Sequence, residues 1–362
     1  MNQTFPILIG DIGGTNVRLR IVKITKDMNA PHEIIEKGKL STQKYPSLEA
    51  ALEEYLGKYK DSENYPQYAV IGIPGPVKNN EILKLANIPH WPKANGDEFA
   101  KKFNMKQFIF LNDFTCNAYG IQTNLKLNED YIIINDVPPQ EGGVIGIIGP
   151  GSGLGTSYLI KDPKNEFYSI GSCEGGHMDF FSKNKKHFEL AEFTKKLIGK
   201  DILCIERLLS GQGLIPMYKF LFSTEKNVGR DEELGKKIDA LNDLKNVLEV
   251  DKLNYELVSK GLKNECPLCK KVIELFVEIF GEVAGNISLY SLPTNGLYLV
   301  GGLSIAFQNV IKDTTIFMDH FVNKDTFGYL LKTFPVYLVK NDDLGVLGAA
   351  ECARRLILKY EK

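Results

Sequence analysis

The sequence predicts an α/β protein built from two related domains. Short apolar segments with strand character end directly in glycine or polar residues, as at 68–73 before Pro74 and 144–148 before Gly149. Strands that are apolar along their length indicate sheets covered on both faces. At 362 residues, the chain is long for a single core and suits two domains.

A weak internal repeat supports this division. Residues 8–15 and 147–153 each have the pattern of a strand leading into a glycine turn, and the second copy begins about 140 residues after the first. Residues 158–160 continue the second copy as 19–21 continue the first. We interpret the two copies as a duplicated domain with a nucleotide held between the halves.

Further elements follow from local patterns in the chain. Strands are expected at 108–111 and 297–300. Ser47 is expected to be the N-cap of a helix that starts at 48–52. A strongly apolar stretch from 272 to 289 predicts a buried helix before the strand at 297.

Two lysine-rich stretches give no indication of a catalytic role. Residues 223–256 are charged and predict a solvated helical excursion, to which we assign no role. Residues 183–186 predict an exposed loop, with a binding patch as the alternative.

The turn after the first strand is the most informative segment. Residues 10–16 read Gly-Asp-Ile-Gly-Gly-Thr-Asn, and such glycines let backbone N–H groups approach a polyphosphate. Asp11 is a candidate to hold hydrated Mg²⁺ beside it. The sequence lacks G-x-x-x-x-G-K-[ST], which argues against a P-loop, and the turn leads into a strand where a Rossmann loop leads into a helix. An ordinary hairpin turn is the alternative.

Three acidic positions are candidates for chemistry. Asp113 follows a strand directly and is either a base that accepts a hydroxyl proton or the cap of the helix after it. Glu174 and His177, with glycines between them, suit recognition of vicinal hydroxyls, and metal ligation is the alternative. Glu206 precedes a Ser-Gly turn and either faces a ligand or pairs with a neighbour.

Composition narrows the function classes. The net charge of −1 gives no indication of a nucleic-acid or membrane partner, and no apolar run reaches the length of a membrane span. The first strand begins by about Phe5, so we expect no signal peptide and a cytosolic location. The pair Cys266 and Cys269 lacks a second ligand pair at zinc spacing, so two free thiols at a helix start are expected, with a redox pair as the alternative.

Six motifs occur in order along the chain, at residues 11–16, 111–114, 149–155, 174–180, 206–211 and 301–302. Their order and spacing resemble those of the bacterial-type glucokinases of the hexokinase–actin–Hsp70 superfamily. The similarity runs over nearly the whole chain, from about Pro6 to a glycine-bearing helix near 344–348.

The resemblance implies a fold and a reaction. The fold would be two ribonuclease-H-like domains with the active site in the cleft between them, a small one at 1–112 plus about 336–362 and a large one at 113–335. The reaction would be ATP- and Mg²⁺-dependent phosphorylation of D-glucose at the 6-hydroxyl, the first step of glycolysis, by a homodimer. A non-catalytic sugar sensor and an actin-like ATPase are the alternative functions.

The resemblance also implies residue roles. Asp113 would be the general base and Asp11 would orient Mg²⁺ through water. The implied sugar ligands are Asn87, Asn112, Asp113, Glu174, His177 and Glu206. The implied nucleotide ligands are Asp11, Gly13, Gly14, Thr15 and Asn16 in one loop, Gly151, Ser152 and Gly153 in a second, and Gly301 and Gly302 at the adenine.

Overall fold

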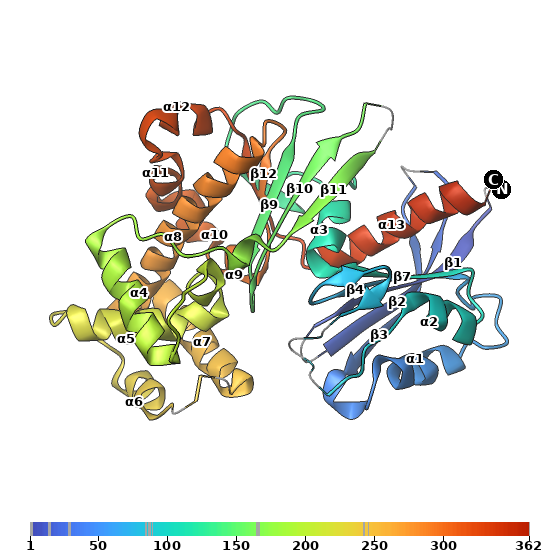
Figure 1. Cartoon of the computed structure of the whole chain (residues 1–362), viewed down its shortest axis with the longest axis horizontal. Coiled ribbons are helices and arrows are strands. Elements are labelled where there is room, and N and C mark those ends of the chain that lie inside the picture. Colours follow the sequence, from blue (N-terminus) through green and yellow to red (C-terminus); the bar gives the residue numbers. More distant parts are fainter. Residues whose placement is uncertain are drawn as a thin grey trace. The chain divides into compact units, whose positions relative to one another are not determined.

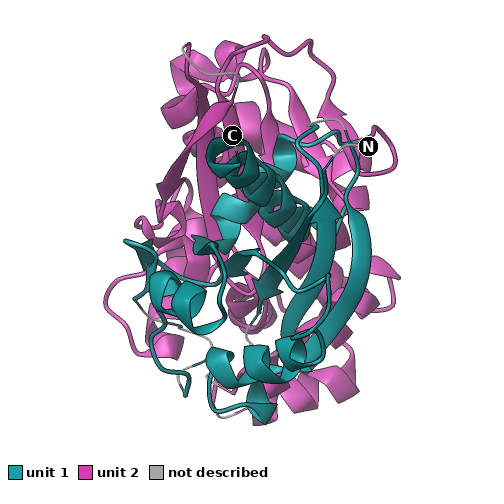
Figure 2. Ribbon diagram, turned by 90° about the vertical axis from the view of Figure 1, so that its right-hand side faces the viewer, with its two compact units in different colours: residues 1–125, 341–362 teal, residues 126–340 magenta. Residues whose placement is uncertain are grey.

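The chain forms two compact units in the computed structural model (Figures 1 and 2). Unit 1 comprises residues 1–125 and 341–362, and unit 2 comprises residues 126–340. The residues described are 3–13, 16–27, 30–83, 85, 88, 90–163, 167–241, 243–244 and 246–361. The boundary expected after Asn112 falls inside unit 1, and the one expected near 336 falls before the last strand of unit 2.

Unit 1 is built on a five-stranded sheet in the order β3-β2-β1-β4-β7. Strands β3, β2 and β1 are antiparallel neighbours, whereas β1, β4 and β7 run parallel. The sheet strands are β1 (Phe5–Ile12), β2 (Asn16–Ile24), β3 (Glu33–Ser41), β4 (Tyr68–Ile73) and β7 (Gln107–Asn112). The other elements are η1 (Thr42–Lys44), α1 (Leu48–Gly57), β5 (Val77–Lys78), β6 (Glu81–Ile82), α2 (Gly96–Lys102), α3 (Asp113–Ile121) and α13 (Leu344–Tyr360).

Both faces of this sheet are covered, as the apolar strands predict. Successive side chains of a strand point to opposite faces, so Leu8 and Ile12 of β1 join one core and Ile7 and Ile9 join another. Ser47 caps α1 as predicted, because its Oγ accepts a hydrogen bond of 3.1 Å from the Ala50 N–H.

Glycines allow α3 and α13 to pack closely together in unit 1. A Cβ added at Gly348 would lie 1.7 Å from the carbonyl oxygen of Cys116, and one at Gly120 would lie 2.4 Å from that of Leu344. The C-terminal helix therefore supports α3, at whose first residue Asp113 lies.

Unit 2 is built on a six-stranded sheet in the order β11-β10-β9-β12-β13-β8. Its strands are β8 (Tyr131–Asn135), β9 (Ile145–Pro150), β10 (Leu154–Lys161), β11 (Tyr168–Cys173), β12 (Leu297–Leu299) and β13 (Val336–Val339). Strands β11, β10 and β9 are antiparallel neighbours, and β9, β12 and β13 are parallel. This succession of directions is the same as in unit 1, and β9–β10 corresponds to β1–β2, which agrees with the internal repeat.

The helices of unit 2 gather around α8, whose buried residues form much of the core. The helix predicted at 272–289 is this element, α8 (Pro267–Ser291). The other helices are η2 (Gly175–His177), α4 (Lys185–Ile198), η3 (Ile205–Arg207), α5 (Gly211–Thr224), α6 (Glu232–Ala240), α7 (Val247–Leu262), α9 (Gly302–Ala306), α10 (Gln308–Asp313), α11 (Ile316–Val322), η4 (Asp325–Phe327) and α12 (Gly328–Leu331).

The lysine-rich stretch at 223–256 is helical as predicted, but the expectation that it is solvated is wrong for one face. Leu234 and Ile238 of α6 and Val250, Leu253 and Leu257 of α7 are buried in the core. Spacings of three and four residues place the apolar side chains of α7 on one side of the helix. The lysine content of the segment conceals this pattern.

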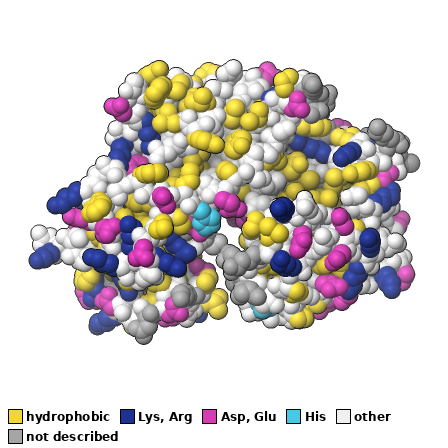
Figure 3. All heavy atoms as spheres, in the orientation of Figure 1, with side chains coloured by type: hydrophobic (Ala, Val, Ile, Leu, Met, Phe, Trp, Pro, Cys, Tyr) yellow, Lys and Arg dark blue, Asp and Glu magenta, His cyan; other side chains and the backbone are white. Residues whose placement is uncertain are grey.

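The charged side chains are mixed in sign on the face drawn in Figure 3, where Lys and Arg lie among Asp and Glu. None of the helices in the described part of the chain combines the length and apolar character needed to cross a membrane.

Candidate active site

The first candidate phosphate loop is the turn between β1 and β2. The Gly13 N–H donates a hydrogen bond of 2.8 Å to the Asn16 carbonyl, and Ile12 faces Val17 as the last strand pair. Gly14 and Thr15, expected in the same loop, lie outside the described residues. The predicted strand–turn–strand pattern is therefore confirmed up to the tip of the turn.

Asp11 lies near the carboxyl end of β1 in a charged environment. Arg18 faces it on β2, and Asp343, the residue before α13, also acts on it. Burial raises the pKa of Asp11, Arg18 lowers it, and Asp343 raises it. A bound cation counters such an unfavourable carboxylate environment. Sequence reasoning missed Asp343, although two aspartates stand directly before the glycine-bearing C-terminal helix.

Asn112 and Asp113 lie where β7 becomes α3. Asn112, rather than Asp113, is the N-cap, because its Oδ1 accepts from the N–H groups of Phe114 at 2.9 Å and Thr115 at 3.3 Å. Its Nδ2 donates to the Gly75 carbonyl at 3.2 Å. Asp113 occupies the first turn and also accepts from the Phe114 N–H at 2.9 Å.

This arrangement distinguishes between the two interpretations of Asp113, as a base or as the cap of the helix. Because the cap is supplied by Asn112, the half-buried Asp113 carboxylate is not required as the N-cap. Its place at the positive end of a helix suits a negative charge. Asn87, the looser match among the sugar candidates, lies outside the described residues.

The second candidate phosphate loop is the turn 151–153 between β9 and β10. The Gly151 N–H donates to the Gly153 carbonyl at 2.8 Å and closes the turn. A Cβ added at Gly151 would meet no atom within 4 Å, so one side of the turn is open. The Ser152 carbonyl accepts from Gln212 Nε2 at 3.3 Å.

Glu206 binds the end of this turn. Its Oε2 accepts a hydrogen bond of 2.9 Å from the Leu154 N–H, and a Cβ added at Gly153 would lie 2.6 Å from the same oxygen. The alternative in which Glu206 pairs with another group of the protein is therefore realised, and that group is the backbone at the end of the candidate phosphate loop. Glycine at 153 is required for this close approach.

The segment that carries Glu174 and His177 lies beside the segment that carries Glu206 because the two pair through their backbones. The segment after η2 pairs with the segment before η3, through Phe180 N–H to the Leu203 carbonyl at 2.9 Å and Ile205 N–H to the Met178 carbonyl at 2.9 Å. A Cβ added at Gly176 would lie 2.2 Å from the Leu154 carbonyl oxygen. The segment carrying these two residues therefore packs on the start of β10, where Glu206 also binds.

Gly301 and Gly302 also lie beside the second turn. The Val300 N–H donates to the Ile148 carbonyl at 2.9 Å, because β12 runs parallel to β9. Gly301 has φ of 91° and its added Cβ would lie 2.6 Å from the Pro150 carbonyl, so only glycine suits this position. Within unit 2, the second phosphate turn, the sugar candidates Glu174, His177 and Glu206 and the adenine candidates thus belong to segments that pack on one hairpin.

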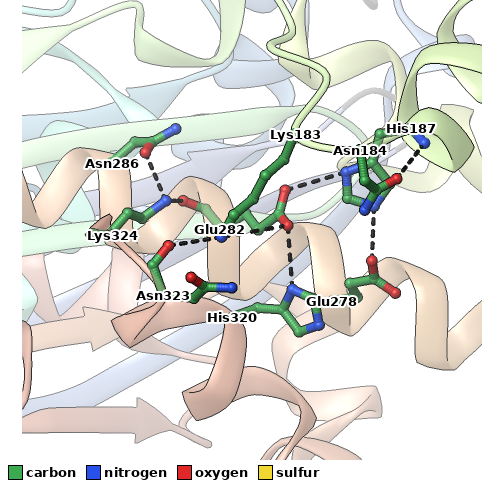
Figure 4. A network of polar contacts seen from close by, with 9 residues as sticks. All are labelled: Lys183, Asn184, His187, Glu278, Glu282, Asn286, His320, Asn323 and Lys324. Carbon is green, nitrogen blue, oxygen red and sulfur yellow. Dashed lines mark hydrogen bonds and ion pairs between the residues drawn. The ribbon is translucent and has the colours of Figure 1, made fainter. Parts of the chain in front are cut away.

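A separate polar network in unit 2 joins α4, α8 and α11 (Figure 4). His187, fully buried, lies with Nε2 2.8 Å from Glu278 and with Nδ1 3.2 Å from Glu282 in an ion-pair contact. The His320 Nδ1 lies 3.2 Å from Glu282. Lys183 lies 4.0 Å from the Glu282 carboxylate, and Lys324 donates to the Glu282 carbonyl at 2.7 Å. Sequence reasoning missed this network.

The network fits a protonated histidine better than a metal ion. His187, Glu278 and Glu282 have the donor atoms of a metal site, within 4.8 Å of one another, but His187 turns a different nitrogen to each carboxylate. One ion binds one imidazole nitrogen, whereas an imidazolium carries a proton on both. Burial alone would lower the pKa of His187. The contacts with Glu278 and Glu282 have a larger effect in the opposite direction and raise this pKa to about 9.

The two cysteines of the C-x-x-C pair are buried free thiols at the start of α8, as expected. Cys266 is the N-cap, and its Sγ accepts from the Cys269 N–H at 3.4 Å. Burial raises the pKa of Cys269, which makes it a poor nucleophile.

Comparison with known proteins decides the family. The model of the glucokinase family matches residues 8–356. The chain belongs to the glucokinase family. It is a sugar phosphotransferase of the actin-like ATPase fold, in an ATP-dependent kinase family.

Individual glucokinases are similar over their whole length. The glucokinase of Nostoc punctiforme is 30% identical over 358 residues, which cover 97% of this chain and 99% of that protein. The glucokinase of Yersinia enterocolitica is 26% identical over 348 residues, with 96% of each chain covered.

Solved glucokinase structures share the fold. A glucokinase from an Antarctic psychrotroph superimposes with a TM-score of 0.77 at 23% identity, covering 98% of this chain and 100% of that one. A ROK family glucokinase from Streptomyces griseus, solved in complex with glucose and AMPPNP, gives a TM-score of 0.59 at 18% identity, covering 97% of this chain and 99% of that one.

Proposed function

We propose that the chain transfers the γ-phosphoryl group of ATP to the 6-hydroxyl of D-glucose, with Asp113 as the general base. One observation carries the proposal. The candidate sugar carboxylate Glu206 hydrogen-bonds at 2.9 Å to the Leu154 N–H at the end of the candidate phosphate loop. Sugar and phosphate recognition thus meet at one backbone position, as a reaction between the two substrates requires.

Each unit supplies part of the chemistry. In unit 1, Asp113 would accept the proton of the 6-hydroxyl as that oxygen attacks the γ-phosphorus. The bond from phosphorus to the ADP oxygen breaks, and its electron pair leaves with ADP. In unit 2, the N–H groups of the 151–153 turn would bind phosphate oxygens, and Glu174, His177 and Glu206 would bind sugar hydroxyls.

Asp11 suits a hydrated Mg²⁺. Oxygen ligands are those Mg²⁺ prefers, and the burial that raises the pKa of Asp11 makes a nearby cation favourable. We propose that Asp11 holds the ion through water. When bound, the ion would neutralise charge on the transferred phosphoryl group.

The sugar ligands would also set specificity. Sites whose polar groups pair with substrate hydroxyls reject analogues that lack those hydroxyls, by a factor of about 10⁴. Because the chain belongs to the glucokinase family, we propose glucose as the preferred hexose. We also propose a cytosolic homodimer, on the family resemblance, and sedimentation velocity with the purified chain tests the dimer.

The test is a coupled assay of glucose 6-phosphate formation with and without Mg²⁺, using mannose and fructose for comparison. Mg²⁺-dependent turnover that is highest on glucose is expected. Glucose binding without turnover would favour a non-catalytic sugar sensor instead. ADP release that does not depend on sugar would favour an actin-like ATPase.

A further inference from the structure

Helix α7 carries one polar side chain in the middle of its buried face. Asn254 is 7% exposed and lies between Val250, Leu253 and Leu257, all buried in the core of unit 2. This helix belongs to the lysine-rich segment for which the sequence indicates no role. A buried amide is unfavourable unless its polar atoms are hydrogen-bonded. The hydrogen bonds of Asn254 therefore indicate why an amide lies at this position.

Only one end of the Asn254 amide is hydrogen-bonded. Its Nδ2 donates to the Gly211 carbonyl at 2.7 Å, whereas its Oδ1 is buried without a hydrogen-bond partner. A leucine would fill a similar volume and would leave no unpaired side-chain atom. Core packing alone therefore does not explain an amide at this position. The amide differs from a leucine in its hydrogen bond to Gly211.

Gly211 connects that bond to the candidate phosphate loop. It is the first residue of α5, and its N–H donates to the Gly151 carbonyl at 2.8 Å. A Cβ added at Gly211 would lie 3.5 Å from both Asn254 Nδ2 and the Gly151 oxygen. The Gly151 N–H in turn donates to Gly153 at 2.8 Å. Three consecutive hydrogen bonds thus lead from α7 to the closure of the turn.

The other supports of the turn act at different points. Glu206 binds the Leu154 N–H, and the exposed Gln212 binds the Ser152 carbonyl at 3.3 Å. Since a Cβ at Gly151 would meet nothing within 4 Å, side-chain packing does not hold the beginning of the turn. Backbone hydrogen bonds hold Gly151 instead, and the one from Gly211 connects it to α5 and, through Asn254, to α7.

We propose that Asn254 is a positioning residue that orients the 151–153 turn for the phosphates of ATP. This inference rests on the proposed function, in which that turn binds ATP. Asn254 acts through Gly211 and Gly151 and does not touch the nucleotide. A preorganised turn binds more tightly, because its N–H groups need not be ordered by the ligand.

The experiment compares Asn254→Leu with Val250→Ala. Asn254→Leu removes the hydrogen bond to Gly211 but fills a similar volume. Val250→Ala weakens the packing of the same buried face of α7 and leaves the amide in place. Asn254→Ser, whose side chain is too short to reach Gly211 in the same way, is the second variant if the leucine protein does not fold. The dissociation constant for Mg·AMPPNP, the KM for ATP and glucose, and the Tm are measured for each protein.

We expect Asn254→Leu to weaken AMPPNP binding and raise the KM for ATP by about fivefold, the effect of one hydrogen bond, with the KM for glucose within about twofold. Hydrogen exchange should increase in peptides covering 151–153. Val250→Ala should lower the Tm but leave the nucleotide affinity unchanged.

Unchanged AMPPNP affinity in both Asn254 variants, with an active wild type, would overturn the positioning role and leave the proposed function intact. Equal loss of affinity in Val250→Ala would also overturn it, since general loosening of α7 would then be sufficient. A wild-type chain that binds no nucleotide would overturn both proposals together.

Discussion

The hairpins β1–β2 and β9–β10 hold equivalent places in their two sheets, but they obtain their polar groups differently. The first contains its own carboxylate, Asp11, with Arg18 opposite on the neighbouring strand. The second turn contains only glycine and serine, and its support comes from Glu206, Gly211 and Gln212. Both copies of the supersecondary unit thus offer a candidate phosphate turn, but only the first adds a carboxylate that suits a cation.

The difference predicts different kinetic phenotypes for the two units. On the proposed roles, Asp113 in unit 1 would accept a proton during the reaction, so its loss should lower kcat, and Asp11 would hold Mg²⁺, so its loss should raise the Mg²⁺ requirement. The unit 2 residues would bind groups already present in the substrates, so their loss should raise KM.

The largest effect is expected for Asp113→Asn, which keeps the shape of the side chain but removes the base. The kcat should fall at least about 10²-fold, and the KM for glucose should change little. Steady-state kinetics measures both. Asp97→Asn, in the first turn of α2 in the same unit, is the matched control and should retain wild-type kcat. Near-normal turnover in the Asp113 variant would exclude it as the base.

A smaller loss is expected for Asp11→Asn, because a residue that holds a metal ion through water contributes about 10- to 100-fold to metal affinity. The Mg²⁺ concentration that gives half-maximal activity should rise by that factor. A magnesium titration at saturating ATP and glucose measures it. If instead only the KM for glucose changed, the first hairpin would belong to sugar recognition.

Different substitutions of Glu206 distinguish sugar binding from phosphate binding within unit 2. Glu174→Gln and Glu206→Gln should each raise the KM for glucose about tenfold, the effect of a hydrogen bond to a charged group, with ATP affinity kept. Glu206→Ala should also weaken ATP binding, because it removes the acceptor of the Leu154 N–H. Calorimetry with glucose and with Mg·AMPPNP distinguishes these outcomes. Loss of ATP affinity in Glu174→Gln would assign that residue to the nucleotide.

The smallest effect on activity is expected for the His187 network, which lies on α4, α8 and α11 of unit 2, includes none of the candidate site residues and should act on stability. Contacts with Glu278 and Glu282 raise the pKa of His187 from 6.5 to about 9. A raised pKa in the folded state means that this stabilisation is complete below pH 6.5 and is lost as the pH rises through about 9. The shift corresponds to at most about 3 kcal/mol.

Hydrogen exchange of unit 2 peptides between pH 6.5 and 9.5, corrected for the intrinsic rate, measures this loss. His187→Gln should remove the loss of protection that belongs to His187, and unit 1 peptides are the internal control. Lys324, whose pKa burial lowers to about 8, also titrates in this range with the opposite sign, and its contribution should remain in the variant. A pH dependence of equal size in both units would contradict this assignment. Glu278 and Glu282 act on His187 directly. His320 acts on both carboxylates, Lys186 acts on Glu278 and Lys183 acts on Glu282.

Much of the architecture follows from the sequence, because its signals are local. Apolar strands ending in glycine, the Ser47 cap and the apolar stretch of α8 depend on neighbouring residues, and each was predicted and confirmed. The motifs were also sufficient to identify the family. The buried face of α7 was missed, since acidic and basic residues stand between its apolar residues, which are spaced three and four apart.

Only the tertiary structure decided which polar atoms meet. The sequence left Asp113 as either base or cap, and the structure assigns the cap to Asn112, because cap geometry depends on how β7 enters α3. Glu206 and Leu154 are far apart in the chain, as are Asn254 and Gly211. Such bonds form when helices and strands pack into one core, so residue order alone does not specify them.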